Sequence, residues 1–347
     1  MRVLIDTTFA RRAPLSGTGI YVNRLLSELA ELDGVEPIEV ANIRRRPPAG
    51  GGPGSLRNLG GDIWWATAEL PRLARRSRAD LIHHPLPAHS PGAGIRQLIT
   101  VTDLAYEVLP GHFDRGFRLY SHHHHRAAAR AADAVICISH TTATDVRRIW
   151  GVRPDRIAVA LLGPGQDLPP GAGAPAAAPT HFLYVGDNEP RKNLETLLTA
   201  YALYRAGGAA GPPLGLILAG SASARMAGVR VEPRPSAARL AGLYRGAAAL
   251  IHPSLHEGFG LTPLEAMRIG TPVLAARSPG ITEVCADAVR YADPRDPAGF
   301  ATAMAELALD RGLRAELRER GRRRAAEFSW SGCARAHVDA YSLALHL

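Results

Sequence analysis

The sequence predicts an α/β protein made of two doubly wound, Rossmann-like domains that face each other across a cleft. Short apolar runs alternate with amphipathic ones along the chain, which is typical of parallel sheets covered by helices on both faces. The 347 residues, 46% of them hydrophobic, are enough for two cores. A stretch rich in Pro, Gly and Ala interrupts the alternation once. We therefore expect an N-terminal domain over 1–165, a linker over 166–179, a C-terminal domain over 180–329 and a last helix over 330–347.

The first half opens with a strand, a glycine loop and a helix. MRVLID is a short apolar strand, SGTG is the loop, and the helix carries Ile20, Leu25, Leu26 and Leu29 at helical spacing. Further strands are expected at ADLIHHP, QLITVTD, AVICIS and RIAVALLG, and further helices at RAAARAAD and TTATDVRRIWGV.

The second half repeats the alternation after the linker. Strands are expected at HFLYVGD, PLGLILAGS, AALIHPS and TPVLAA, and helices at NLETLLTAYALYRA, SAARLAGLYRGA and LTPLEAMRIG. Ligands of doubly wound sheets bind at the carboxyl ends of the strands. The loops after HFLYVGD and AALIHPS are therefore the candidate binding loops.

Charge and cysteine content limit the classes of function. The net charge of +9 fits an anionic substrate, a membrane surface or nucleic acid, but a general bias toward arginine also raises it. Lys192 is the single lysine among 41 basic residues, and a compact ammonium suits phosphate oxygens. Cys137, Cys285 and Cys333 lack metal-ligand spacing and are odd in number, which argues against zinc and disulfides. With no long apolar run and no charged leader, we expect a cytoplasmic protein.

The loop HEGFG and the helix after it place two acids on either side of a helix start. Glu257 lies in the loop, and Glu265 lies about one turn into the helix, for which Thr262 is the expected N-cap. Gly258 and Gly260 let the backbone approach a ligand, and the free amides of the helix start favour an anion such as a diphosphate. Two interpretations stay open: the acids bind groups on either side of that anion, or Thr262 and Glu265 form a capping box and Glu257 is solvated.

Two cations follow the strand HFLYVGD in the turn NEPRKN. Pro190 stiffens the turn, and Arg191 and Lys192 project from it just before a helix, where cations oppose the helix dipole. An anionic group should compensate them. Together with the glycine loop at the same sheet edge, they predict a diphosphate clamp.

These motifs resemble those of the retaining nucleotide-sugar glycosyltransferases of family 4 (glycosyl transferases group 1), which have the GT-B fold. The resemblance rests on EGFGLTPLEAMRIGTPVLA, with seven residues between its two glutamates, on YVGDNEPRKNLETLL and on SGTGIYVNRLL. VTDLAYEVLP and RAADAVICISHTTATDV resemble first-domain segments of the family more loosely. The resemblance implies transfer of a sugar from a nucleoside diphosphate sugar with retention at the anomeric carbon, no cofactor, no required metal ion, and a C-terminal helix that returns to the first domain.

The site residues of the family carry over to the matching positions. Arg191 and Lys192 would neutralise the diphosphate, Glu265 would hold the ribose hydroxyls, and Glu257 would lie near the hydroxyls of the donor sugar. The backbone of the loop and helix start would bind the sugar and phosphates at Gly258, Phe259, Gly260, Leu261 and Thr262. In the first domain, the loop Gly17, Thr18, Gly19 would approach the phosphates.

One position departs from the family pattern. The usual His-Asp pair is Thr102-Asp103 here, so Asp103 is left to orient a hydroxyl of donor or acceptor without a neighbouring imidazole. His83 and His84, at the end of ADLIHH, either lie near this pair or are ordinary surface histidines at a strand end, and we favour the second interpretation. The departure keeps two alternatives to a transferase open: a nucleotide-sugar epimerase or hydrolase, and a non-catalytic nucleotide-sugar-binding partner.

Two further segments have competing interpretations. The run His122 to His125 lies in a predicted helix, where consecutive side chains point in different directions, so we expect no metal site. In the segment 60–78, Trp64 and Trp65 precede an arginine-rich end, and Ile63, Ala66, Leu70 and Leu73 mark one helical stripe. The segment is either a peripheral contact with the inner face of the plasma membrane or a core-facing helix with a solvated basic end. Nucleic-acid binding is not expected, because aromatic residues are not interleaved with the basic ones.

The sequence thus predicts a bacterial glycosyltransferase. Its donor would be the nucleotide-linked form of a hexose or deoxyhexose, with mannose-like sugars included. Its acceptor would be a glycan, a lipid-linked molecule or a small natural product.

Overall fold

The computed structural model describes residues 1–44, 53–166, 168, 178–207 and 212–346. The chain divides into two compact units, Met1–Gly163 with Trp330–Leu347, and Pro164–Ser329. The C-terminal helix therefore belongs to the first unit, as the resemblance implies. The first boundary falls after Gly163 rather than after 165, and most of the expected linker lies outside the described residues. Within the described part of the chain, no helix is long and apolar enough to cross a membrane.

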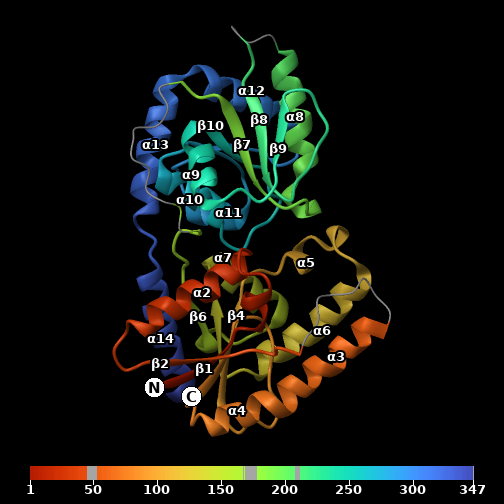
Figure 1. The fold of residues 1–347 in the computed structure, drawn as a ribbon, viewed down its shortest axis with the longest axis vertical. Coiled ribbons are helices and arrows are strands. Elements are labelled where there is room, and N and C mark those ends of the chain that lie inside the picture. Colours follow the sequence, from red (N-terminus) through yellow and green to blue (C-terminus); the bar gives the residue numbers. More distant parts are fainter. Residues whose placement is uncertain (45–52, 167, 169–177, 208–211, 347) are drawn as a thin grey trace. The chain divides into compact units, whose positions relative to one another are not determined.

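The first unit is built on a six-stranded parallel sheet in the order β2-β1-β3-β4-β5-β6 (Figure 1). Its strands are β1 (Arg2–Asp6), β2 (Glu36–Val40), β3 (Leu81–His84), β4 (Arg96–Val101), β5 (Ala134–Cys137) and β6 (Ile157–Val159). All residues of β3 and β5 are buried, as expected for central strands covered on both faces. Strand β2 was not predicted, because it contains Pro37 and exposes Glu36 and Glu39, and these features suit its place at the sheet edge.

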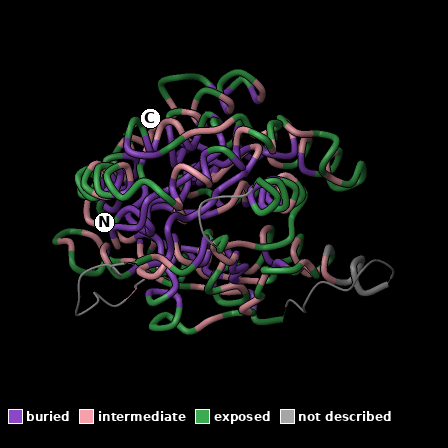
Figure 2. Tube along the Cα trace, turned by 90° about the horizontal axis from the view of Figure 1, so that it is seen from above, coloured by how far each residue is buried: buried purple, intermediate pink, exposed green. Residues whose placement is uncertain are grey.

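Helices cover both faces of this sheet. They are α1 (Thr8–Arg12), α2 (Gly17–Ala30), α3 (Pro53–Trp64), α4 (Leu70–Arg76), α5 (Ala105–Val108), α6 (Arg115–Ala131), α7 (His140–Asp145) and α14 (Trp330–His346). Helix α2 buries the stripe that includes Leu25 and Leu29 and exposes its opposite face, and α14 packs against α2, β4 and β5. Figure 2 shows buried trace gathered in the interior and exposed trace toward the outside.

The helical segment that contains both neighbouring tryptophans is interrupted. A π-helical turn, Trp65–Glu69, joins α3 to α4, and Pro71 follows at the start of α4. Such a turn shifts the faces of the helix on either side of it. Leu70 is buried, whereas Ile63 is 55% exposed, so the predicted single stripe through Ile63 and Leu70 is wrong.

The second unit has its own six-stranded parallel sheet, in the order β12-β11-β10-β7-β8-β9 (Figure 1). Its strands are β7 (His181–Gly186), β8 (Gly215–Gly220), β9 (Val229–Glu232), β10 (Ala247–His252), β11 (Val273–Ala276) and β12 (Arg290–Ala292). Its helices are α8 (Leu194–Ala206), α9 (Ala237–Gly246), α10 (Leu261–Ile269), α11 (Pro279–Cys285), α12 (Pro297–Leu309) and α13 (Arg311–Ala325). The chain runs outward from β7 in one direction and from β10 in the other. The carboxyl ends of these two adjacent strands therefore form the topological switch point, where doubly wound sheets bind ligands.

Part of the arginine excess stabilises the fold of this unit. Arg314, Arg318 and Arg324 of α13 donate hydrogen bonds to main-chain carbonyls at the ends of other helices. The acceptors are Leu307 and Ala308 of α12, Gly270 after α10, and Glu283 and Val284 of α11. These carbonyls lack partners within their own helices, so a cation there is favourable.

Candidate active site

The two predicted binding loops of the second unit meet at the switch point. Arg191 and Lys192 lie in a 3₁₀ turn after β7, and Glu257 lies in the loop after β10. Asn193 ends the turn in a left-handed conformation (φ 57°), and its side-chain amide donates to the carbonyls of Pro253 at 3.1 Å and Pro294 at 2.7 Å. The main chain adds a bond, from Leu255 N to Arg191 O at 2.9 Å. The position of the two cations is thus fixed by the other loop.

Glu257 compensates both cations. Its Oε1 lies 2.6 Å from Lys192 Nζ and its Oε2 lies 3.0 Å from Arg191 Nη1, and all three side chains are less than one fifth exposed. Arg191 also contacts Glu189, at 2.8 Å. Burial alone would raise the pKa of Glu257, but Lys192, His252 and Arg191 together hold it well below its usual range. The interpretation of Glu257 as a solvated acid is therefore wrong.

His252 is a member of this cluster that sequence reasoning missed. It ends β10, is 3% exposed, and its Nε2 lies 3.3 Å from Glu257 Oε1. Burial lowers the pKa of His252, and although Glu257 opposes this, Lys192 and Arg191 lower it further, so the imidazole is neutral at pH 7. The charge of Glu257 is therefore offset by the two cations and not by the histidine. The sequence does not indicate this role for His252, because a histidine at the end of a strand has no characteristic spacing from the loop HEGFG.

Glu265 sits in a separate, closed environment on α10. Its Oε1 accepts a hydrogen bond from Gln166 N at 2.6 Å, and its Oε2 accepts one from the Tyr244 hydroxyl at 2.9 Å. The chain approaches so closely at Gly165 that a Cβ atom there would lie 2.0 Å from Glu265 Oε1. Burial raises the pKa of Glu265 to about 7, against the two hydrogen bonds, which lower it. Sequence reasoning did not find Tyr244, which reaches this carboxylate from α9.

The glycine loop starts α10 differently from the prediction. The N-cap is Gly260, whose φ of +117° favours glycine, and not Thr262, which lies inside the first turn. Because Thr262 is not the cap and Glu265 bonds elsewhere, the capping-box interpretation is wrong. The main-chain amides of Leu261 and Thr262 belong to the first turn, whose amides have no acceptor within the helix.

The rest of the loop is held by packing. Phe259 is 3% exposed, with its ring edge-on to Phe328 at 5.7 Å. Gly280 at the start of α11 abuts the loop, since a Cβ atom there would lie 2.1 Å from the Glu257 carbonyl oxygen. The backbone from Gly258 to Gly260 is thereby fixed between α11 and the core.

The predicted site residues of the first unit occupy the ends of two elements. Gly17, Thr18 and Gly19 form the first turn of α2 rather than a loop, because the Ser16 hydroxyl accepts a hydrogen bond from Gly19 N at 3.1 Å and caps the helix. Asp103 follows β4, and its Oδ1 accepts a hydrogen bond from Ala105 N at 2.9 Å. Both lie at carboxyl ends of strands or at helix starts, where the fold presents ligand-binding groups.

His83 and His84 are buried, so their interpretation as surface histidines is wrong. His83 belongs to a chain of hydrogen bonds between β3, β4, α2 and α14, in which neighbouring atoms are 2.7 to 2.9 Å apart. Its members in order are Tyr341, His83, Thr100, Tyr21, His337 and the Cys333 carbonyl. A carbonyl only accepts, so every group donates to the next member when His337 Nδ1 carries the proton. Burial lowers the pKa of His83 and of His337, the latter to about 4, and both rings are neutral at pH 7.

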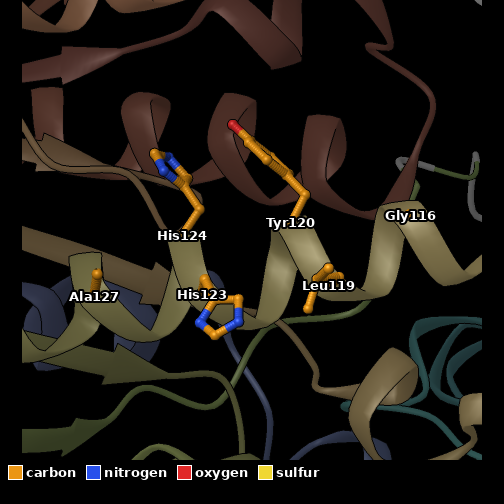
Figure 3. Close-up of a pocket in the computed structure, with 6 residues that line it drawn as sticks. All are labelled: Gly116, Leu119, Tyr120, His123, His124 and Ala127. Carbon is orange, nitrogen blue, oxygen red and sulfur yellow. The ribbon is translucent and has the colours of Figure 1, made fainter.

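A shallow hollow lies apart from these residues, on the outer face of α6. It is lined by Gly116, Leu119, Tyr120, His123, His124 and Ala127. Figure 3 shows Tyr120 and His124 pointing to one side of the helix, and Leu119 and His123 to another. His122 and His125 contact Glu107 and Tyr106 instead. Among the residues that the structure describes, no group of three or more His, Cys, Asp or Glu could hold a metal ion.

Comparison with known proteins identifies relatives of this chain. The family model described as "Glycosyltransferase Family 4" matches residues 15–163, and the model described as "Glycosyl transferases group 1" matches residues 174–324. An O-antigen chain mannosyltransferase B of Escherichia coli is 27% identical over 292 residues, which are 78% of this chain and 76% of the relative. A D-inositol 3-phosphate glycosyltransferase of Xylanimonas cellulosilytica is 33% identical over 244 residues, which are 62% of this chain and 58% of the relative.

Solved structures share the whole fold at low identity. A sucrose-phosphate synthase of Thermosynechococcus elongatus superposes with a TM-score of 0.75 at 22% identity, over 99% of this chain and 98% of that one. The Anabaena protein HepE in complex with UDP and glucose superposes with a TM-score of 0.71 at 17% identity, over 99% of both chains.

Two α/β units, each built on a parallel six-stranded sheet, and a C-terminal helix that belongs to the first unit define a protein of the GT-B fold. With the two family matches, which together span most of the sequence, the chain belongs to the group 1 glycosyltransferases of family 4.

Proposed function

We propose that this protein transfers a hexose or deoxyhexose from a nucleoside diphosphate sugar to an acceptor hydroxyl, with retention at the anomeric carbon and without a required metal ion. The bond between the anomeric carbon and the diphosphate oxygen breaks, and a bond from the acceptor oxygen forms on the same face of the sugar. The O–H bond of the acceptor breaks, and its proton is released to water. The nucleoside diphosphate leaves with one more negative charge than it carried in the donor.

The observation that carries this proposal is the pair of cations at the switch point of the second sheet. Arg191 and Lys192 are fixed by the loop after β10, beside the start of α10. Cations and helix-start amides stabilise the charge that grows on a leaving diphosphate. Two such cations supply the neutralisation that a divalent metal ion provides in other phosphoryl sites, which supports metal independence.

The two acids have different roles in the proposal. Glu265, held between Gln166 N and Tyr244, accepts the hydroxyls of the nucleotide ribose. Glu257 faces the sugar end, where its negative charge favours a transition state with positive charge at the anomeric carbon. The main chain of Gly258, Phe259 and Gly260 binds the donor between them. Asp103 and the start of α2, at Gly17 to Gly19, contribute from the first unit, with Asp103 orienting a donor or acceptor hydroxyl.

The relatives suggest the class of donor and acceptor. One is described as an O-antigen chain mannosyltransferase and several as inositol 3-phosphate glycosyltransferases. We therefore propose a mannose-like donor sugar and an acceptor that is a glycan, a lipid-linked molecule or a small polyol.

A peripheral membrane contact through the segment 60–78 is a further part of this proposal. Ile63 and Trp64 are 55% and 41% exposed, and the Arg44 guanidinium lies 4.9 Å from the Trp64 ring centre. Exposed aromatic and aliphatic side chains beside arginines suit the headgroup region of an anionic membrane. Cosedimentation with phosphatidylglycerol vesicles tests it, since Trp64→Ser should reduce binding; equal binding would reject the contact.

Incubation with a panel of UDP-, GDP- and dTDP-linked sugars tests the proposed reaction. We expect one donor to release its nucleoside diphosphate, faster with acceptor present, both with and without EDTA. Tight binding without release would favour a non-catalytic binding partner. Conversion of the donor sugar without release of the nucleoside diphosphate would favour an epimerase. Loss of activity in EDTA would reject only the proposed metal independence and not the transfer reaction.

A further inference from the structure

The two cations of the proposed diphosphate site already contact a carboxylate. Lys192 Nζ lies 2.6 Å from one oxygen of Glu257 and Arg191 Nη1 lies 3.0 Å from the other. A phosphate group is recognised in the same way, through two of its oxygens by neighbouring cations. Glu257 thus already contacts one nitrogen of each cation to which the diphosphate is assigned, and Glu189 contacts a second nitrogen of Arg191 at 2.8 Å.

Because this cluster is buried, Glu257 competes strongly with a phosphate for the two cations. The side chains of Glu257, Arg191 and Lys192 are 11%, 17% and 18% exposed, so water screens their charges weakly. His252 is neutral and brings no further positive charge. The three ions carry one net positive charge, and a diphosphate that takes over both cations leaves Glu257 with only the His252 imidazole 3.3 Å from its Oε1.

We propose that Glu257 is an internal competitor of the donor, which holds Arg191 and Lys192 in place before binding and releases them to the diphosphate. The proposal rests on the proposed function, because it assigns the diphosphate to this pair of cations. When the cations turn to the leaving group, the carboxylate regains its uncompensated charge beside the sugar. Glu257 therefore weakens binding of the diphosphate and strengthens the transition state of transfer.

Removal of the charge of Glu257 should separate these two effects. In Glu257→Gln, a negative charge a few ångströms from the bound anion disappears, and at an effective dielectric constant of about 20 this changes a binding constant by a factor of about ten or more. We expect calorimetric titration with inorganic pyrophosphate to show binding tightened about ten-fold. The turnover of the donor should fall at least about ten-fold in the same variant. A merely structural role of Glu257 would weaken both.

A charge-matched control and a second variant make the test decisive. Glu319→Gln removes an equal charge from an exposed position on α13 and should leave pyrophosphate binding unchanged. The double variant Glu257→Gln with Lys192→Met keeps the net charge of the cluster, which protects the fold if the single variant is unstable. Because Glu257 no longer occupies the cations, Lys192→Met should weaken pyrophosphate binding more in the Glu257→Gln background than in the native one.

Each outcome bears on the competitor role alone or on both the competitor role and the diphosphate site. Weaker or unchanged pyrophosphate binding in Glu257→Gln, or equal effects of Lys192→Met in both backgrounds, would overturn the competitor role even if sugar transfer is observed. Tighter binding in Glu257→Gln supports it, even if no nucleotide sugar in the panel is a donor. No pyrophosphate binding by any of the proteins would overturn both the diphosphate site and the competitor role.

Discussion

Replacement of Glu265 by glutamine should stabilise the second unit while it weakens nucleotide binding. Burial raises the pKa of Glu265 from 4.5 to about 7, so the folded unit retains this proton over a range in which the unfolded chain loses it. The contribution of this proton to the free energy of unfolding is fully present below pH 4.5 and is lost as the pH rises through 7. At about 1.4 kcal/mol per pH unit, ionised Glu265 costs about 3 kcal/mol at pH 8.

Glutamine keeps both contacts of the carboxylate and cannot ionise. Its carbonyl oxygen can accept from Gln166 N, and its amide can donate to the Tyr244 oxygen, which reverses the direction of the hydrogen bond that Tyr244 donates to the carboxylate. We expect Glu265→Gln to gain up to about 3 kcal/mol at pH 8 and little at pH 5. For a unit of this size, about 2–4 °C per kcal/mol makes this a rise in Tm of roughly 6–12 °C.

Two spectroscopic signals separate the units in this test. All four tryptophans, at 64, 65, 150 and 330, belong to the first unit, so their fluorescence follows that unit alone. Circular dichroism at 222 nm follows both. At pH 8, the Tm followed by circular dichroism should rise in Glu265→Gln. The Tm followed by fluorescence should stay unchanged where the units unfold separately. An equal or lower Tm of the helical transition at pH 8 would refute the buried, proton-retaining carboxylate.

Three further perturbations test other parts of the structure. Tyr21→Phe leaves His337 Nε2 without a donor and the Thr100 hydroxyl proton without an acceptor, although Thr100 still accepts from His83. The first unit should therefore lose about 3 kcal/mol in urea unfolding followed by tryptophan fluorescence; a loss under about 1 kcal/mol would contradict the hydrogen-bond chain. The same signal should show the first unit losing at least about 3 kcal/mol as the pH falls from 6.5 through 4. The lowered pKa of His337 delays its protonation until the chain unfolds and accounts for about 3 kcal/mol, and the lowered pKa of His83 adds to the loss; constant stability would show that these rings are not buried neutral. Gly280→Ala places a methyl group against the Glu257 carbonyl. Sugar transfer should therefore fall about ten-fold or more while the circular dichroism spectrum stays unchanged. Native activity would show that α11 does not fix the loop.

The fold was predictable because its signals are repeated along the chain. Buried strands such as β3 and β5 are short apolar runs, and helices such as α2 carry a regular stripe. Edge strand β2 escaped prediction because exposed glutamates and a proline hide it. The stripe through Ile63 failed because a π-helical turn changes which face is buried, and the sequence around Trp65 does not announce such a turn.

The candidate site was predictable where its residues follow a sequence spacing and not where they meet only through tertiary contacts. The spacing of Glu257 and Glu265 and the adjacent Arg191 and Lys192 are visible in one dimension. His252 and Tyr244 lie elsewhere in the chain, and only the fold brings them to those carboxylates. The N-cap was misassigned for a similar reason, since a glycine with positive φ starts α10 where Thr262 offered the commoner signal.

The central claim is that Lys192 and Arg191 hold the diphosphate of a nucleotide-sugar donor. Calorimetric titration of the intact protein with UDP and with GDP, at about 150 mM salt, tests it directly. We predict that at least one of them binds, that Lys192→Ala weakens this binding about twenty-fold or more, and that Arg268→Ala, at an exposed position on α10, leaves it unchanged. Equal affinity of the native protein and Lys192→Ala would contradict the claim.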